Sequence, residues 1–214
     1  MQIRSLDLDV IGDVICPWCW VGKRQLEGAK AILDGKLALN TVWKPFQLNP
    51  GLPHEGVDRR VYRKAKFGSL DYSAKLDARV AEAGRAVGLE FRHDRMTWTP
   101  NTFDAHRLIW LAGLEGAQDA VVEGLFRAYF SEGRNTGDMA VLIQIAEESG
   151  LNANDIGKRL AAGAGAAEVS EDLQRGLGAG VDSVPTIALG GRPLISGAVP
   201  AEQLAATLLK LDSR

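Results

Sequence analysis

Residues 6–33, LDLDVIGDVICPWCWVGKRQLEGAKAIL, carry the pattern that decides the fold. Residues 6–15 are rich in branched apolar side chains that partly alternate with polar ones, which predicts a strand. Cys16 and Cys19 come next, and apolar residues then recur at helical spacing as far as Gly35, where a helix can end. The stretch therefore predicts a strand, a pair of cysteines and a helix in direct succession.

The flanking sequence extends this stretch to an α/β domain. Residues 40–48 (NTVWKPFQL) predict a second strand, which completes the strand–helix–strand order of a parallel βαβ unit. Near the C-terminus, residues 186–189 and 193–196 predict two strands joined by a tight turn at Gly190 and Gly191, and a closing helix follows. Both ends of the chain are therefore expected to meet in one sheet.

The middle of the chain has a different character. Residues 52–178 carry almost only helical patterns, for example Met139, Leu142 and Ala146 at the spacing of one helix face. We therefore predict an α/β domain that is interrupted by a helical insertion domain. The predicted boundaries are residues 1–51 and 179–214 for the α/β domain and 52–178 for the insertion.

The composition is that of a globular protein with balanced charge. Of 214 residues, 46% are apolar and 24% charged, which is enough to bury a core. Lys and Arg total 25 against 27 for Asp and Glu, so the net charge of −2 argues against nucleic acid or an anionic membrane as a partner. No segment approaches the roughly 20 apolar residues of a membrane span, and no apolar run of signal length follows Met1. We expect a cytoplasmic protein.

The chain has only two cysteines, and their spacing predicts redox chemistry. Cys16 falls at the start of the predicted helix, where free backbone N–H groups and the helix dipole favour a thiolate. Pro17 suits the first helical position, and Cys19 lies one turn further on, close enough to form a disulfide with Cys16. Cys16 is then the attacking nucleophile, and Cys19 resolves the mixed disulfide.

Three other roles compete with redox function: a structural disulfide, a zinc site, and two buried thiols that are not paired. A disulfide between such near neighbours closes a very small loop and stabilises a fold little. A zinc site needs about four ligands, and the remaining donors His54, His93 and His106 are not paired at ligand spacing. We expect neither a metal nor a tightly bound cofactor.

A second motif, Ser183-Val184-Pro185-Thr186, precedes the first of the two C-terminal strands. A proline in this position can simply mark the start of an edge strand. It can also signal a cis peptide bond between Val184 and Pro185.

Together these motifs resemble the thioredoxin-like fold in its DsbA-family form, with finer similarity to the FrnE-like branch. The similarity covers nearly the whole chain. The segments that carry it are residues 13–27 (DVICPWCWVGKRQLE), residues 45–50 (PFQLNP), Asn101-Thr102 with residues 105–108 (AHRL), and residues 180–204.

The resemblance implies specific roles around the cysteines. Pro185 is expected to be cis and to pack against the pair, and the backbone of Val184 to hold an extended substrate by strand-like hydrogen bonds. The helical insertion is expected to cover the active site, with Asn101 and Thr102 at its entrance. Trp18 either offers an apolar contact to substrates or packs against the insertion.

The predicted activity is thiol–disulfide exchange with a protein or small-molecule substrate, coupled to an external redox partner. A glutathione-dependent isomerase or transferase is the alternative, with glutathione as co-substrate. Relatives of that kind typically have Ser in place of Cys16 and a polar Ser-Asp pair where this chain has Gly197-Ala198-Val199. A third interpretation is a chaperone-like scaffold in which the cysteines are incidental.

Three further features of the sequence each allow two interpretations. His106 is either a hydrogen-bonded structural residue of an apolar helix or a base. The basic run over residues 59–66 is either a solvated helix face or a contact for acidic substrates. Asp13 is either a polar strand end or a carboxylate that moves protons for Cys19.

Overall fold

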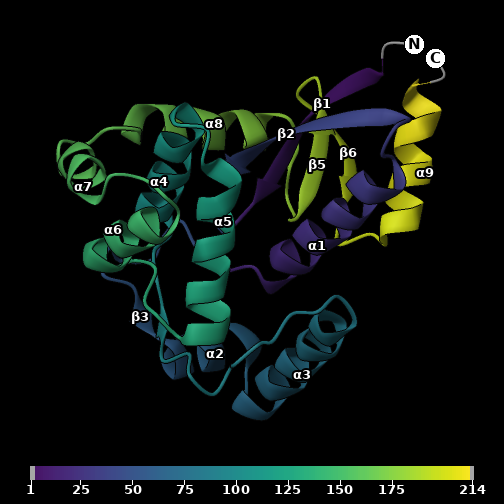
Figure 1. Cartoon of the computed structure of the whole chain (residues 1–214). Coiled ribbons are helices and arrows are strands. Elements are labelled where there is room, and N and C mark those ends of the chain that lie inside the picture. The colour runs from purple at the N-terminus through teal and green to yellow at the C-terminus, as the bar shows by residue number, and fades with distance from the viewer. Residues whose placement is uncertain (1–2, 213–214) are drawn as a thin grey trace.

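A computed structural model of the protein describes residues 3–212. Its main sheet has four strands in the order β2-β1-β5-β6. The strands are β1 (Arg4–Gly12), β2 (Leu37–Pro45), β5 (Thr186–Leu189) and β6 (Arg192–Ser196). β1 pairs in parallel with β2 and antiparallel with β5, and β5 pairs antiparallel with β6. The two ends of the chain therefore share one sheet, as the sequence predicts, and β1 lies inside it (Figure 1).

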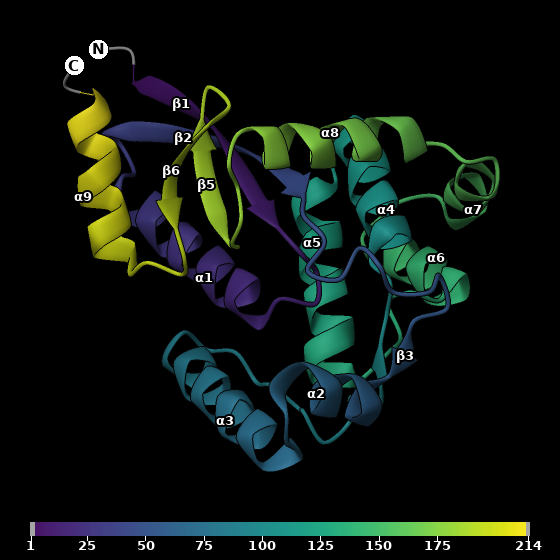
Figure 2. The same cartoon turned by 180° about the vertical axis from the view of Figure 1, so that it is seen from behind.

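Two helices from opposite ends of the sequence lie side by side along this sheet. They are α1 (Pro17–Ile32) and α9 (Ala201–Asp212), and both views show them together (Figures 1 and 2). The side chain of Gln25 accepts a hydrogen bond from the Ala201 N–H at 2.9 Å. The turn between β5 and β6 is the predicted glycine pair, since Gly190 and Gly191 both have positive φ, 58° and 74°. This arrangement fixes the start of α1 at the carboxyl end of β1.

The middle of the chain is mainly helical, as predicted. Asp138 and Asn152 are N-caps, since their side chains accept hydrogen bonds from the backbone N–H groups of Ala140 and Asp155. The helical elements are α2 (Arg59–Phe67), α3 (Leu70–Ala86), α4 (Phe103–Leu114), α5 (Gln118–Arg127), a π-helical turn (Ala128–Glu132), α6 (Met139–Glu148), α7 (Ala153–Ala161) and α8 (Ala166–Gly178).

The bounds of two strands differ from the prediction. β1 ends at Gly12 rather than three residues later, because the Cys16 N–H bonds to the carbonyl of Asp13 at 2.9 Å and turns the chain. β2 starts and ends about three residues before the predicted 40–48. The N–H of Leu48 bonds to the Asp13 carboxylate instead of to a strand. The earlier ends of β1 and β2 therefore both lie at the turn that carries the cysteines.

A short antiparallel pair within the helical part was not predicted. It joins β3 (Val57–Asp58) to β4 (Trp98–Thr99), far apart in the sequence. Two-residue strands are too short to show an alternating pattern, so their pairing leaves no signal in the sequence. The pair brings the start of α2 next to the segment that leads into α4.

The buried core is continuous across the predicted domain boundary. Trp20 of α1 stacks on Phe126 of α5, with ring centroids 6.2 Å apart, and on Phe130 of the π-helical turn at 5.8 Å. Phe126 also meets Trp43 of β2 edge to face, at 6.0 Å. These side chains belong to one hydrophobic cluster that includes residues of both parts. The sheet and the helical part are thus packed as one body around the aromatic residues.

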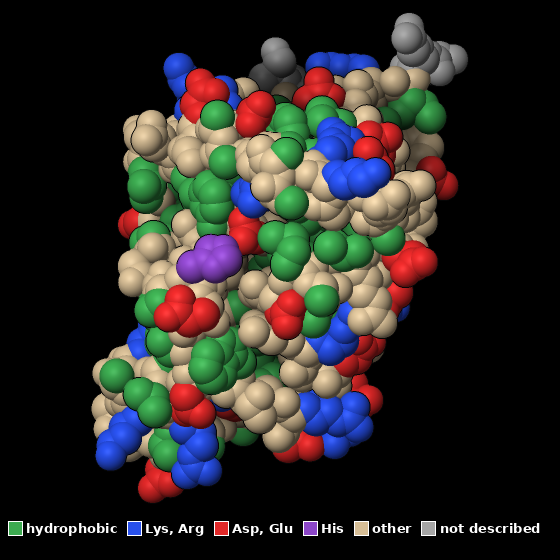
Figure 3. Space-filling view, turned by 90° about the vertical axis from the view of Figure 1, so that its left-hand side faces the viewer, with side chains coloured by type: hydrophobic (Ala, Val, Ile, Leu, Met, Phe, Trp, Pro, Cys, Tyr) green, Lys and Arg blue, Asp and Glu red, His purple; other side chains and the backbone are tan. Residues whose placement is uncertain are grey.

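The surface agrees with the balanced composition. On the face shown in Figure 3, positive and negative side chains are interspersed around scattered hydrophobic ones, and neither charge dominates. Within residues 3–212, no helix is long and apolar enough to cross a membrane.

Candidate active site

The turn between β1 and α1 places Cys16 at the start of the helix. Cys16 is the N-cap residue, with φ −88° and ψ 110°, and Pro17 follows in the first helical turn. The Cys16 side chain makes no capping hydrogen bond, so its sulfur is available to other partners. Cys16 as a whole is only 5% exposed. The position predicted from sequence, at the start of the helix, is confirmed.

The loop before β5 lies against this turn. The peptide bond between Val184 and Pro185 is cis, as the resemblance implies. The Cys16 thiol donates to the Val184 carbonyl oxygen with an S···O distance of 3.7 Å. Pro185 packs on α1 so closely that a Cβ added to Gly22 would lie 2.8 Å from its Cγ. The glycine at position 22 therefore lets the helix approach the cis-proline loop.

Cys19 is buried beneath Cys16. It is 0% exposed, and a Cβ added to Gly12 would lie 3.1 Å from its sulfur. Burial raises the pKa of the Cys19 thiol well above its ordinary value, and the adjacent Cys16 and the Asp13 carboxylate raise it further, whereas the backbone of Asp13 lowers it. This shift favours the neutral thiol of Cys19, which is consistent with the resolving role predicted for it.

Asp13 and His106 form a buried polar pair behind the cysteines. One carboxylate oxygen of Asp13 accepts the Leu48 N–H at 2.7 Å. The other lies 3.5 Å from His106 Nε2 and has no hydrogen-bond partner among the described residues. Nε2 of His106 is nearer to the Phe46 carbonyl oxygen, at 2.9 Å. His106 thus ties α4 to the segment after β2, which is the structural role considered for it.

Replacing Asp13 by asparagine is expected to lower the pKa of Cys19. The carboxylate charge now raises this pKa, whereas an asparagine keeps an oxygen that can accept the Leu48 N–H but carries no charge. The measurement is the ultraviolet absorbance of the thiolate against pH in a Cys16→Ser background, where Cys19 is the only thiol. Asp7→Asn, which removes an exposed carboxylate near the start of the same strand, is the control. A Cys19 pKa that stays the same or rises contradicts the expectation.

Cys16 opens into a cleft between the cysteine turn and the helical part. The cleft has a volume of about 490 Å³. Trp18 and Val184 line it beside Cys16, and Trp18 is 39% exposed. The opposite wall comes from α2 and α3, which lie below the start of α1 in Figures 1 and 2. The helical part therefore covers the cysteines from one side, as the resemblance implies.

The structure places Asn101 and Thr102 away from this cleft. Neither residue lines it. Asn101 donates to the Leu52 carbonyl at 2.9 Å and accepts from the Gln47 side chain at 3.1 Å, and Thr102 is buried. Both residues hold the loop before α4 in place. Their assignment to substrate binding stays a prediction that the shape of the cleft does not support.

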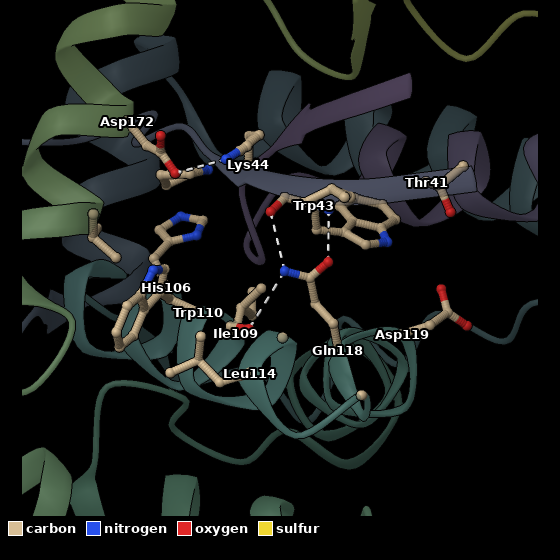
Figure 4. Close-up of a pocket in the computed structure, with 15 residues that line it drawn as sticks. Thr41, Trp43, Lys44, His106, Ile109, Trp110, Leu114, Gln118, Asp119 and Asp172 are labelled. Carbon is tan, nitrogen blue, oxygen red and sulfur yellow. Dashed lines mark hydrogen bonds and ion pairs between the residues drawn. The ribbon is translucent and has the colours of Figure 1, made fainter. Parts of the chain in front are cut away.

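A second cavity, of about 450 Å³, is lined by residues of β2, α4, α5 and α8 (Figure 4). Its polar groups are already paired. Gln118 accepts the Trp43 N–H at 2.8 Å and donates to the Trp43 carbonyl at 3.3 Å. Lys44 pairs with Asp172 at 3.1 Å. No cysteine lines this cavity, so it is not the redox site.

One functional feature that sequence reasoning missed is the role of Asp77 in the cleft wall. Asp77 of α3 pairs with Arg59 at 3.2 Å and with Arg63 at 2.5 Å. The sequence shows the basic run over residues 59–66, but the carboxylate that pairs with it lies on the next helix. The spacing of Arg59 and Arg63, four residues apart on one helix face, was the available signal. In the described part of the chain, no group of three or more His, Cys, Asp or Glu side chains is arranged to hold a metal ion.

Comparison with known proteins agrees with this geometry. Residues 7–209 match the model of the DSBA-like thioredoxin domain family. A probable DsbA oxidoreductase from Streptomyces coelicolor is similar in structure, with a TM-score of 0.86 and 29% identity over 98% of this chain and 91% of that one.

Two more distant structures share the fold. The cytosolic disulfide reductase DsbM from Pseudomonas aeruginosa has a TM-score of 0.69 and 22% identity, covering 97% of this chain and 99% of that one. A 2-hydroxychromene-2-carboxylate isomerase has a TM-score of 0.70 and 16% identity, covering 97% and 96%. The match of the family model to nearly the whole sequence, with a cysteine pair facing a cis-proline loop, leads to one conclusion: the chain belongs to the DSBA-like thioredoxin domain family.

Proposed function

We propose that the protein is a thiol–disulfide oxidoreductase that uses Cys16 and Cys19 beside the cis-Pro185 loop. The observation that carries this proposal is the position of Cys16, which starts a helix, contacts the Val184 carbonyl and lines an open cleft. Similarity to a probable DsbA oxidoreductase supports the same reaction class.

The first step is attack by the Cys16 thiolate on a substrate disulfide. A Cys16–substrate mixed disulfide forms, and the other substrate sulfur leaves as a thiolate that takes up a proton. The backbone of Val184 would hold an extended substrate segment next to Cys16, and Trp18 would pack against its apolar part.

The second step is attack by Cys19 on the Cys16 sulfur. It releases the second substrate thiolate and leaves a Cys16–Cys19 disulfide, so two electrons pass from the protein to the substrate. Cys19 must lose its proton in this step, against the raised pKa that burial imposes. Every step is reversible, so an oxidised protein would take electrons from a substrate dithiol by the same route.

The chain has no third cysteine, and this implies an external redox partner. These 214 residues contain only two cysteines, so within them there is no second cysteine pair to which Cys16 and Cys19 can pass electrons. The partner is a second protein or a small thiol such as glutathione, which DsbM has been seen to bind in a solved structure. We place the reaction in the cytoplasm, in line with the description of DsbM as cytosolic.

Cys19→Ser is expected to stop the reaction after its first step. Incubation with a disulfide substrate should convert the variant to a stable Cys16–substrate mixed disulfide, because no second thiol can displace the substrate. Mass spectrometry of the intact protein measures the added mass. In the Cys16→Ser control no adduct should form. A glutathione isomerase mechanism predicts instead that Cys19→Ser keeps full turnover, and that outcome would reject the proposal.

A further inference from the structure

The cleft next to Cys16 is richer in positive than in negative side chains. Four cationic side chains and two carboxylates line it. The cations are Arg59, Arg63, Lys66 and Arg79, and the anions are Asp77 and Asp182. A substrate in the cleft therefore meets an excess of positive charge close to the reactive sulfur.

Asp77 neutralises only part of this charge. It pairs with both Arg59 and Arg63, and His93 Nε2 lies 3.8 Å from it. Burial is the main cause that lowers the pKa of His93. The Asp77 carboxylate raises this pKa and the positive charges of Arg59 and Arg63 lower it, and the net downward shift favours the neutral ring. This part of the cleft lining thus has two arginines for one carboxylate. Nε of Arg63 also donates a hydrogen bond to the Ser73 hydroxyl oxygen.

The two remaining cations have no carboxylate partner within residues 3–212. Lys66 bonds only to neutral oxygens, that of Asn49 at 3.0 Å and that of Tyr62 at 2.6 Å. Arg79 is exposed on α3 and makes no hydrogen bond or ion pair to any described residue. Both side chains are therefore available to bind negatively charged groups.

The size of the cleft favours a small molecule. Its volume of about 490 Å³ falls in the roughly 300–1,000 Å³ range of small-molecule sites. Cys16, Trp18 and Val184 lie along the same cleft as the cations of α2 and α3. One compact ligand can therefore place a disulfide at Cys16 and its charged groups among those cations.

We propose that the substrate of the Cys16–Cys19 pair is a low-molecular-weight disulfide with carboxylate or phosphate groups, bound by Lys66 and Arg79. This inference rests on the proposed thiol–disulfide exchange and names its substrate class. The reduced protein supplies two electrons and two protons. The substrate S–S bond breaks, the Cys16–Cys19 bond forms, and two molecules of the anionic thiol are released.

The test compares disulfides that differ in charge. Full-length reduced protein is mixed with glutathione disulfide, coenzyme A disulfide, hydroxyethyl disulfide or cystamine, which carry carboxylates, phosphates, no charge and positive charge. The rate constant per substrate concentration is measured for each. The double variant Lys66→Gln/Arg79→Gln removes the proposed contacts. Lys64→Gln/Lys75→Gln removes two exposed charges from the same two helices outside the cleft lining and is the matched control.

The expected readout is the ratio of the rate for an anionic disulfide to the rate for hydroxyethyl disulfide. In the cleft variant this ratio should fall about tenfold, because two charge-assisted contacts are lost, while the control variant changes it less than about twofold. Added salt should also lower the ratio in the unmodified protein. A larger fall for glutathione disulfide identifies carboxylates as the preferred group, and a larger fall for coenzyme A disulfide identifies phosphates.

Two results overturn the inference and are distinct from failure of the proposed function. If the cleft variant and the control variant change the ratio equally, Lys66 and Arg79 do not select the substrate. If cystamine reacts as fast as the anionic disulfides, the cleft charge has no role. In both cases exchange itself persists. Failure of the proposed function would appear instead as no reaction of the unmodified protein with any of the four disulfides.

Discussion

Replacing Cys16 by serine is expected to reduce the rate of disulfide exchange by at least about a thousandfold. The serine hydroxyl has nearly the same size as the thiol, but it is not ionised near neutral pH and cannot form the mixed disulfide. Cys16 is the only cysteine that lines the cleft, since Cys19 is fully buried beneath it. The measurement is stopped-flow exchange with a small disulfide, with the released thiol followed over time.

The loss of activity is informative only if the serine variant is folded. Its circular dichroism spectrum and melting temperature should match those of the unmodified chain, because Cys16 makes no capping hydrogen bond that the change would remove. Trp18→Phe keeps both cysteines and an aromatic ring in the cleft, and it should retain exchange. If a folded Cys16→Ser variant keeps more than about a tenth of the rate, another group is the nucleophile.

Replacing Phe126 by alanine is expected to lower the free energy of unfolding by about 3–5 kcal/mol. Phe126 is 1% exposed and contacts aromatic side chains from both parts of the chain, Trp20 of α1 and Trp43 of β2. Truncation removes these contacts and leaves a cavity where the helical part meets the sheet. Urea unfolding, followed both by tryptophan fluorescence and by circular dichroism, measures the loss.

The same experiment tests whether the two parts of the chain form one cooperative unit. Because their core is continuous, both signals should shift together in a single transition. Tyr72→Ala removes an exposed ring of α3, 53% accessible, and should change the free energy of unfolding by less than about 0.5 kcal/mol. A Phe126→Ala variant that loses less than about 1 kcal/mol, or that shifts only one of the two signals, contradicts a shared core.

The main elements of the fold could be predicted because their signals are local. The strand, the cysteine pair and the helix of residues 6–33 follow each other without a gap, and each shows a pattern of its own kind. Gly190 and Gly191 predict the tight turn because glycine readily adopts the positive φ that such hairpin turns need. The cis bond at Pro185 was inferred from family resemblance, since a proline before a strand has two explanations.

The cleft and its charges could not be predicted in the same way. The contacts of Asp77 with Arg59 and Arg63 depend on how α2 and α3 pack, which no local pattern encodes. The Asp13–His106 pair joins residues that are far apart in the sequence, through a turn and an apolar helix. For Asn101 the prediction placed a polar side chain at the cleft, but this side chain donates a hydrogen bond to the Leu52 carbonyl and does not line the cleft.

The most direct test of the account is the redox equilibrium of Cys16 and Cys19 against glutathione. Protein is equilibrated at a series of reduced-to-oxidised glutathione ratios, quenched with acid, and alkylated for mass spectrometry. We predict that both cysteines lose their alkyl labels together as the ratio becomes more oxidising, and that Cys16→Ser forms no internal disulfide at any ratio. If both thiols of the unmodified protein are still alkylated at the most oxidising ratio, Cys16 and Cys19 are not a redox pair and the proposed function is wrong.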